Sequence, residues 1–144
     1  MVALLFWVAF IFGTSCTVVR PLEFFAMVQQ TLGLDEEAMS RFRLFWGISW
    51  FTIVKGWHFT EFAILTGLTA KGLQWWNQSQ SITTIGLAML ACVAFAASDE
   101  WHQTFVPDRF GTLTDVLIDS LGVLVMGGVL IRRQRKFDRS AAID

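Results

Sequence analysis

Residues 98–128 hold the densest group of side chains that could do chemistry in this 144-residue chain. Seven of them ionise: Asp99, Glu100, His102, Asp108, Arg109, Asp115 and Asp119. Carboxylates and imidazoles can transfer protons, and a guanidinium can hold an anion. The stretch lies between apolar runs that are long enough to enter a bilayer, where a charge is costly. We therefore expect these side chains to have partners or a function.

A second polar patch lies upstream and has the spacing of one helix face. Lys55, His58 and Glu61 follow one another at intervals of three residues. On a helix, His58 would lie about 60° from each of the other two. An imidazole beside a carboxylate can act as an oriented base, and the ammonium can hold an anionic group.

Helical spacing also groups the acids of the first stretch. Asp99 and Gln103 are one turn apart, and Glu100 lies about 60° from Gln103. Asp115 and Asp119 are one turn apart on a following helix. Each pair can therefore face a common neighbour.

Four apolar runs are the elements that would position these patches. Hydrophobic residues make up 54% of the chain, with 14 Phe and 7 Trp, which is more than a soluble domain of this size usually buries. A helix needs about 20 residues to cross a bilayer. We predict an all-α fold, a single integral membrane four-helix bundle over residues 1–144, and a soluble helical protein is the alternative. The predicted spans are about 2–19, 52–70, 82–98 and 113–131.

In this bundle the polar ends of three spans meet at one membrane face. The second and fourth spans begin there, the third ends there, and Arg109 lies in the turn between the last two. Acids, imidazoles and the cations Lys55 and Arg109 would line one pocket.

The long connection between the first two spans predicts an additional element. Leu34-Asp35-Glu36-Glu37 has the acidic first turn of a helix, and apolar residues follow on one face. We expect an amphipathic helix lying at the membrane interface. The alternative is that this segment begins the second span.

The distribution of basic residues predicts the orientation. Five Lys or Arg residues lie between Arg132 and Arg139, directly after the fourth span, which favours a cytoplasmic tail over 132–144. Four spans then place both termini in the cytoplasm and the polar pocket outside. The net charge of −1 gives no basic field, so no nucleic-acid partner is expected.

Structural roles could account for part of the polar set. Glu61 could pair with Lys55 or Arg109, and Asp115 suits the first turn of its helix. Asp119 lies more than a turn inside an apolar span, where a lone carboxylate costs about 2.5–3.5 kcal/mol. It needs a partner, and Lys55, His58 and Arg109 are the available ones.

Two sequence blocks resemble a known family. KGWHFTEFAILTGL at 55–68 resembles the K-x-x-H-x-x-E-Y opening of the VanZ-like membrane proteins. SDEWHQTFVPDRFGTLTDVLIDSLG at 98–122 resembles their second block, D-E-x-x-Q-x-F-x-P-x-R-x-G-x-x-x-D followed by D-x-x-G. Phe62 stands where the family has tyrosine, and Asp108 where it has glycine. The resemblance implies a multi-pass protein of the bacterial inner membrane and a link to resistance to the glycopeptide teicoplanin.

Three functions remain open. The first is recognition of an anionic lipid or lipid-linked cell-wall precursor, or of a glycopeptide, with ligand-binding candidates Lys55, Gln103 and Arg109. The second is a membrane enzyme acting on a lipid-linked envelope substrate, with catalytic candidates His58, Glu61, Asp99, Glu100, Asp115 and Asp119. The third is an ion lock between helices. No compact metal motif or cofactor motif occurs, and neither group is expected.

Overall fold

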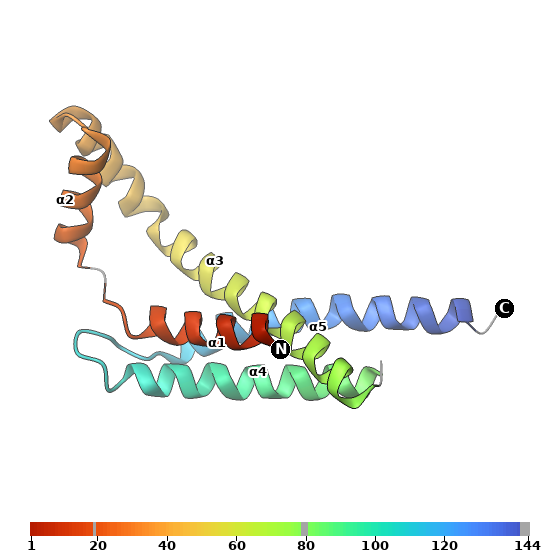
Figure 1. Cartoon of the computed structure of the whole chain (residues 1–144). Coiled ribbons are helices and arrows are strands. Elements are labelled where there is room, and N and C mark those ends of the chain that lie inside the picture. Colours follow the sequence, from red (N-terminus) through yellow and green to blue (C-terminus); the bar gives the residue numbers. More distant parts are fainter. Residues whose placement is uncertain (19, 79–80, 142–144) are drawn as a thin grey trace.

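The computed structural model describes residues 1–18, 20–78 and 81–141 (Figure 1). Within these residues the chain forms five helices and no strand, so the predicted all-α class is confirmed. The helices are α1 (Val2–Ser15), α2 (Pro21–Leu32), α3 (Glu36–Asn77), α4 (Ile82–Gln103) and α5 (Leu113–Ala141).

The apolar character of the described helices supports a membrane protein. By length and composition, α4 and α5 are each able to cross a membrane, whereas α1 is a shorter apolar helix of 14 residues. The expected span 52–70 lies inside α3, which does not reach the same apolarity. The arrangement with four spans therefore stays a prediction.

The largest difference from expectation is the length of α3. It runs for 42 residues, about 63 Å at 1.5 Å per residue. The segment expected to form a separate interfacial helix instead continues directly into residues 52–70. The carboxylate of Asp35 accepts a hydrogen bond from the Ala38 amide and caps the helix, as the acidic start predicted. No proline occurs between Glu36 and Asn77, so none interrupts the helix.

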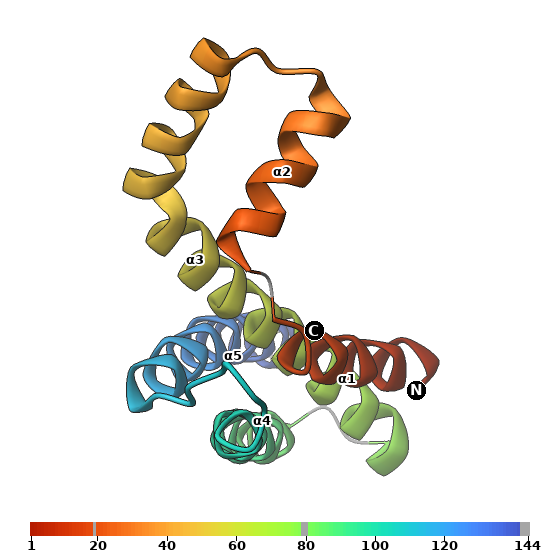
Figure 2. The same cartoon turned by 90° about the vertical axis from the view of Figure 1, so that its left-hand side faces the viewer.

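A short helix that the sequence interpretation missed precedes α3. Pro21 stands at the first position of α2, where its missing N–H costs nothing. Gly33 ends α2 with a left-handed backbone, φ 59°. The Phe24 ring packs against Trp46 of α3, with ring centroids 4.7 Å apart. Figure 2 shows α2 and the first half of α3 projecting away from the other helices.

The last two helices are longer than the predicted spans. α4 continues past residue 98 to Gln103, so its acids lie on the helix itself. α5 continues past residue 131 to Ala141, and the basic tail is helical over this part. Arg, Lys and Gln are good helix formers, and neither Gly nor Pro occurs between 132 and 141.

The core lies where α1, α3, α4 and α5 meet. Its buried residues are Ile11, Phe62, Leu65, Cys92, Ala96 and Val123. At Gly122 of α5, an added Cβ would overlap the carbonyl oxygen of Phe59 in α3. This close backbone contact holds the two helices together just below the polar residues.

Candidate functional site

Nine of the residues selected from the sequence gather at one end of the four packed helices. This is the end where α1 and α4 finish and α5 begins (Figure 1). We call them the polar cluster: Lys55, His58, Glu61, Asp99, Glu100, Gln103, Arg109, Asp115 and Asp119. Six of the nine are buried, namely Glu61, Asp99, Glu100, Gln103, Asp115 and Asp119. Charges this deep require specific contacts.

Gln103 connects the two acids of α4. Its amide nitrogen donates to Asp99 Oδ2 at 2.9 Å and to Glu100 Oε1 at 3.3 Å. Ser15 of α1 donates its hydroxyl to the same Asp99 oxygen at 2.8 Å. The backbone amide of Thr112 donates to Glu100 Oε2 at 2.9 Å. Both carboxylates are thus fixed in orientation by neutral donors.

Arg109 holds the α4–α5 loop against the end of α1. One guanidinium nitrogen donates to the carbonyl oxygens of Thr14 and Thr17, each at 2.6 Å. The other donates to Gln103 Oε1 at 3.3 Å. These carbonyls lie at and just beyond the C-terminal end of α1, where a cation suits the helix dipole. The fork of Arg109 therefore has a structural task of its own.

Lys55 forms an ion pair with Asp115, which joins α3 to the start of α5. The backbone amide of Asp115 donates to the Thr112 hydroxyl oxygen at 3.1 Å, which caps the start of α5. Glu61 does not contact Lys55 or Arg109. Its carboxylate accepts a hydrogen bond from the Thr14 hydroxyl at 3.5 Å, and its backbone carbonyl accepts one from the Trp7 indole at 3.0 Å.

His58 and Asp119 face each other across α3 and α5. His58 Nδ1 lies 3.6 Å from Asp119 Oδ1, so the acid has one of its expected neighbours. Asp119 is fully buried, and neither of its oxygens has a hydrogen-bond partner among the described residues. Glu100 approaches the same point from α4: ligand atoms of His58, Glu100 and Asp119 all lie within 4.8 Å of one another.

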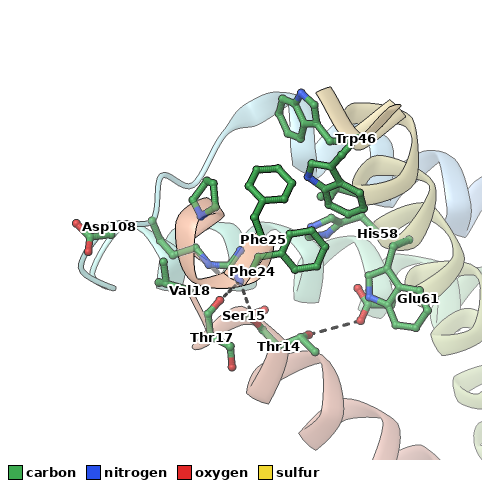
Figure 3. A pocket seen from close by; sticks show the side chains of 15 residues that line it. Thr14, Ser15, Thr17, Val18, Phe24, Phe25, Trp46, His58, Glu61 and Asp108 are labelled. Atoms are coloured by element: carbon green, nitrogen blue, oxygen red, sulfur yellow. Dashed lines mark hydrogen bonds between the residues drawn. The ribbon is translucent and has the colours of Figure 1, made fainter. Parts of the chain in front are cut away.

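An open cavity of about 740 Å³ lies beside the polar cluster. Figure 3 shows the rings of Phe24, Phe25 and Trp46 on one side and the residues at the end of α1 on the other. Three residues of the polar cluster line it, namely His58, Glu61 and Arg109, together with the polar side chains of Thr14, Ser15, Thr17 and Asp108. The lining residues are Thr14, Ser15, Thr17, Val18, Pro21, Phe24, Phe25, Trp46, Trp50, Val54, Trp57, His58, Glu61, Asp108 and Arg109.

The two departures from the family pattern have structural explanations. Phe62 is fully buried in the core and packs against Phe95, so it lies among apolar side chains. Asp108 adopts φ 63°, a conformation that glycine takes readily and that aspartate tolerates better than most residues. It pairs with Arg20 at 3.3 Å and not with Arg109. His102 lies outside the polar cluster, stacked on Phe12.

Sequence reasoning missed the contributions of α1 and α2. The backbone carbonyls of Thr14 and Thr17 could not be identified from the sequence, because every residue has a backbone carbonyl. Ser15 was detectable as a hydroxyl next to an apolar run. The aromatic wall from α2 depends on a helix that was not expected.

The family comparison agrees with the resemblance of the two sequence blocks. Residues 1–133 match the family model described as VanZ/LLP1. No curated protein and no solved structure matches the chain.

Proposed function

The chain belongs to the VanZ/LLP1 family, and on that premise we propose that it is a cell-envelope membrane protein whose cavity binds a lipid with an anionic headgroup. The observation that carries the proposal is the division of the cavity lining. Aromatic rings from α2 and α3 form one side, and polar groups from α1, α3 and the α4–α5 loop form the other. Such a lining fits an amphiphilic lipid, whose apolar tail would lie on the aromatic rings and whose headgroup would lie at the polar cluster.

The aromatic side suits an apolar chain. Trp46 and Phe24 pack together at 4.7 Å and present their rings to the cavity. Trp50 and Trp57 continue this surface along α3 and are about half exposed. Tryptophan is enriched at membrane interfaces, where an apolar ring meets polar groups. The chain of a lipid could therefore leave the cavity directly into the bilayer.

The polar side offers groups for a headgroup. Arg109 lines the cavity while the Thr14 and Thr17 carbonyls hold its guanidinium in place, so its charge is fixed there. The imidazole of His58 adds a further nitrogen, whereas the hydroxyls of Thr14 and Thr17 donate to the Ile11 and Gly13 carbonyls and offer acceptor oxygens. An arginine beside hydroxyls can bind phosphate or carboxylate oxygens.

The family and the basic tail support a finer assignment. We place both termini in the cytoplasm, because the basic residues gather after residue 131, and the cavity at the outer leaflet. A lipid-linked cell-wall precursor has the required apolar chain and anionic headgroup. Binding it there would alter the response of cells to teicoplanin, which acts outside the membrane.

The test compares two tryptophan variants. The protein is purified from bacterial membranes in mild detergent, and co-purifying lipids are identified by mass spectrometry. We expect an anionic lipid to be enriched over the bulk membrane, lost in Trp46→Ala and kept in Trp101→Ala, since Trp101 is exposed and lies outside the cavity. A bound-lipid composition equal to the bulk membrane would refute the proposal. Teicoplanin susceptibility of cells expressing each variant tests the finer assignment.

A second candidate is an enzyme acting on the headgroup. His58 lines the cavity and its Nδ1 lies 3.6 Å from the buried Asp119 carboxylate, which would orient it as a general base on closing to hydrogen-bond distance. Incubation with a radiolabelled lipid-linked precursor in nanodiscs would reveal turnover. Release of a headgroup product by the wild type and its loss in His58→Gln would favour this function over binding alone.

A further inference from the structure

We infer that His58, Glu100 and Asp119 form a binding site for a divalent transition-metal ion. The three side chains come from α3, α4 and α5 and each offers one ligand atom, all within 4.8 Å of one another. Two ligands about 2.1 Å from a tetrahedral ion are about 3.4 Å apart. His58 Nδ1 and Asp119 Oδ1 lie 3.6 Å apart, close to this spacing. The Glu100 ligand atom lies within 4.8 Å of both and would have to move closer to complete the coordination sphere.

Asp119 provides an independent reason for a cation. Its side chain is fully buried, and both carboxylate oxygens lack hydrogen-bond donors in the part of the chain that the structure describes. Buried carboxylate oxygens are normally satisfied, because their lost hydration is expensive. The distance of 3.6 Å to His58 is too long for a hydrogen bond but leaves room for an ion between the two groups.

The charge balance of the polar cluster points the same way. It contains five acids, Glu61, Asp99, Glu100, Asp115 and Asp119, and two permanent cations, Lys55 and Arg109. Lys55 pairs with Asp115, and Arg109 is engaged by carbonyls and Gln103. Among the described residues, the other four acids have no Lys or Arg partner within ion-pair distance. A divalent cation would offset two of these charges.

The surroundings of Glu100 fit a metal ligand. The Thr112 amide and the Gln103 side chain donate to its two oxygens at 2.9 and 3.3 Å. Outer hydrogen bonds of this kind orient the ligands of metal sites. One imidazole with two carboxylates is a mixed nitrogen and oxygen set that suits Zn²⁺ or Mn²⁺, and three protein ligands leave coordination positions open.

The site goes beyond lipid binding and does not depend on it. His58 lines the cavity, whereas Glu100 and Asp119 lie behind it. A bound ion would place positive charge next to the polar side of the cavity, where an anionic headgroup or a water molecule could take an open position.

The experiment measures metal content and affinity on the full-length protein. The chain is purified in detergent with a histidine-free tag, stripped with a chelator, and titrated separately with Zn²⁺ and with Mn²⁺. We expect about one tightly bound ion per chain for at least one of the two metals. Asp119→Asn and His58→Ala should each weaken binding at least about 100-fold, beyond the loss seen when only an outer partner is removed. The electron paramagnetic resonance spectrum of bound Mn²⁺ should show a hyperfine coupling to a ligand nitrogen, and His58→Ala should remove this coupling.

Asp115→Asn is the matched control. It removes an acid one turn away on the same helix face, but this acid pairs with Lys55 and is not in the ligand set. It should keep the metal. The inference fails if the stripped wild type binds neither ion in the millimolar range, or if Asp115→Asn and Asp119→Asn lose binding equally. Because the wild-type titration and His58→Ala stand alone, the test holds even if Asp119→Asn does not fold. Lipid content is a separate measurement, so failure here leaves lipid binding untouched.

Discussion

The close contact between α3 and α5 at Gly122 gives the sharpest structural prediction. A Cβ at this position would lie 3.1 Å from the carbonyl carbon of Phe59 and 3.2 Å from the Ala63 amide nitrogen, and would overlap the Phe59 oxygen. These atoms belong to a helix backbone and cannot rotate away. To reach an ordinary contact of about 3.5 Å, the two helices must separate by on the order of 1 Å. Overpacking of this kind costs about 1–3 kcal/mol.

The assay is thermal unfolding of Gly122→Ala in detergent, with Gly128→Ala as the control. Gly128 lies on the same helix and has nothing within 4 Å of an added Cβ, so alanine there should be neutral or slightly stabilising. We expect Gly122→Ala to lower Tm by roughly 3–9 °C, at about 3 °C per kcal/mol. The same separation would move His58 away from Asp119. His58 is the neighbour of Phe59 on α3, and Asp119 lies about one turn before Gly122 on α5. Equal Tm values for the two variants would refute the close contact.

Three further predictions follow from the polar cluster. Arg109→Ala should lower the unfolding free energy by about 2–4 kcal/mol, and Arg109→Lys by about half as much, because an ammonium lacks the planar fork that reaches Thr14, Thr17 and Gln103 together. If chemical denaturation gives the alanine variant the stability of the wild type, these Arg109 contacts do not stabilise the fold. A double-mutant cycle with Lys55→Met and Asp115→Asn should give a coupling of about 1–2 kcal/mol, and additive effects would mean that the ion pair is not formed. Reporter fusions should show Pro107 outside and the C-terminal end inside, and the reverse pattern would place the polar cluster in the cytoplasm.

Periodicity made part of the polar cluster predictable. Lys55, His58 and Glu61 share a face because three-residue steps nearly complete a helical turn. In the structure Lys55 and His58 contact acids of α5, and Glu61 contacts Thr14 of α1. The apolar pattern also identified the cores of the longer helices. The ends of these helices were less predictable. Arg and Lys are good helix formers, so a basic segment after an apolar run can remain helical, as it does in α5.

The pairing within the polar cluster could not be derived from spacing. Spacing placed Arg109 near the acids but did not reveal that backbone carbonyls of α1 would receive its hydrogen bonds. The meeting of His58, Glu100 and Asp119 joins three helices and depends on how they cross. The cavity wall required α2, which begins at Pro21 and was not expected from the sequence.

The long sequence separations in the polar cluster determine when it can form during synthesis. Arg109 contacts carbonyls 92 and 95 residues earlier in the chain, and Ser15 contacts an acid 84 residues later. Asp115 meets Lys55 across 60 residues. A nascent chain that has delivered only α1 to α4 therefore holds Lys55 and His58 without their acidic partners on α5. The end of α1 therefore reaches its full set of contacts only after α4 and the α4–α5 loop have followed, and a chain truncated before α5 would leave Lys55 without its acid.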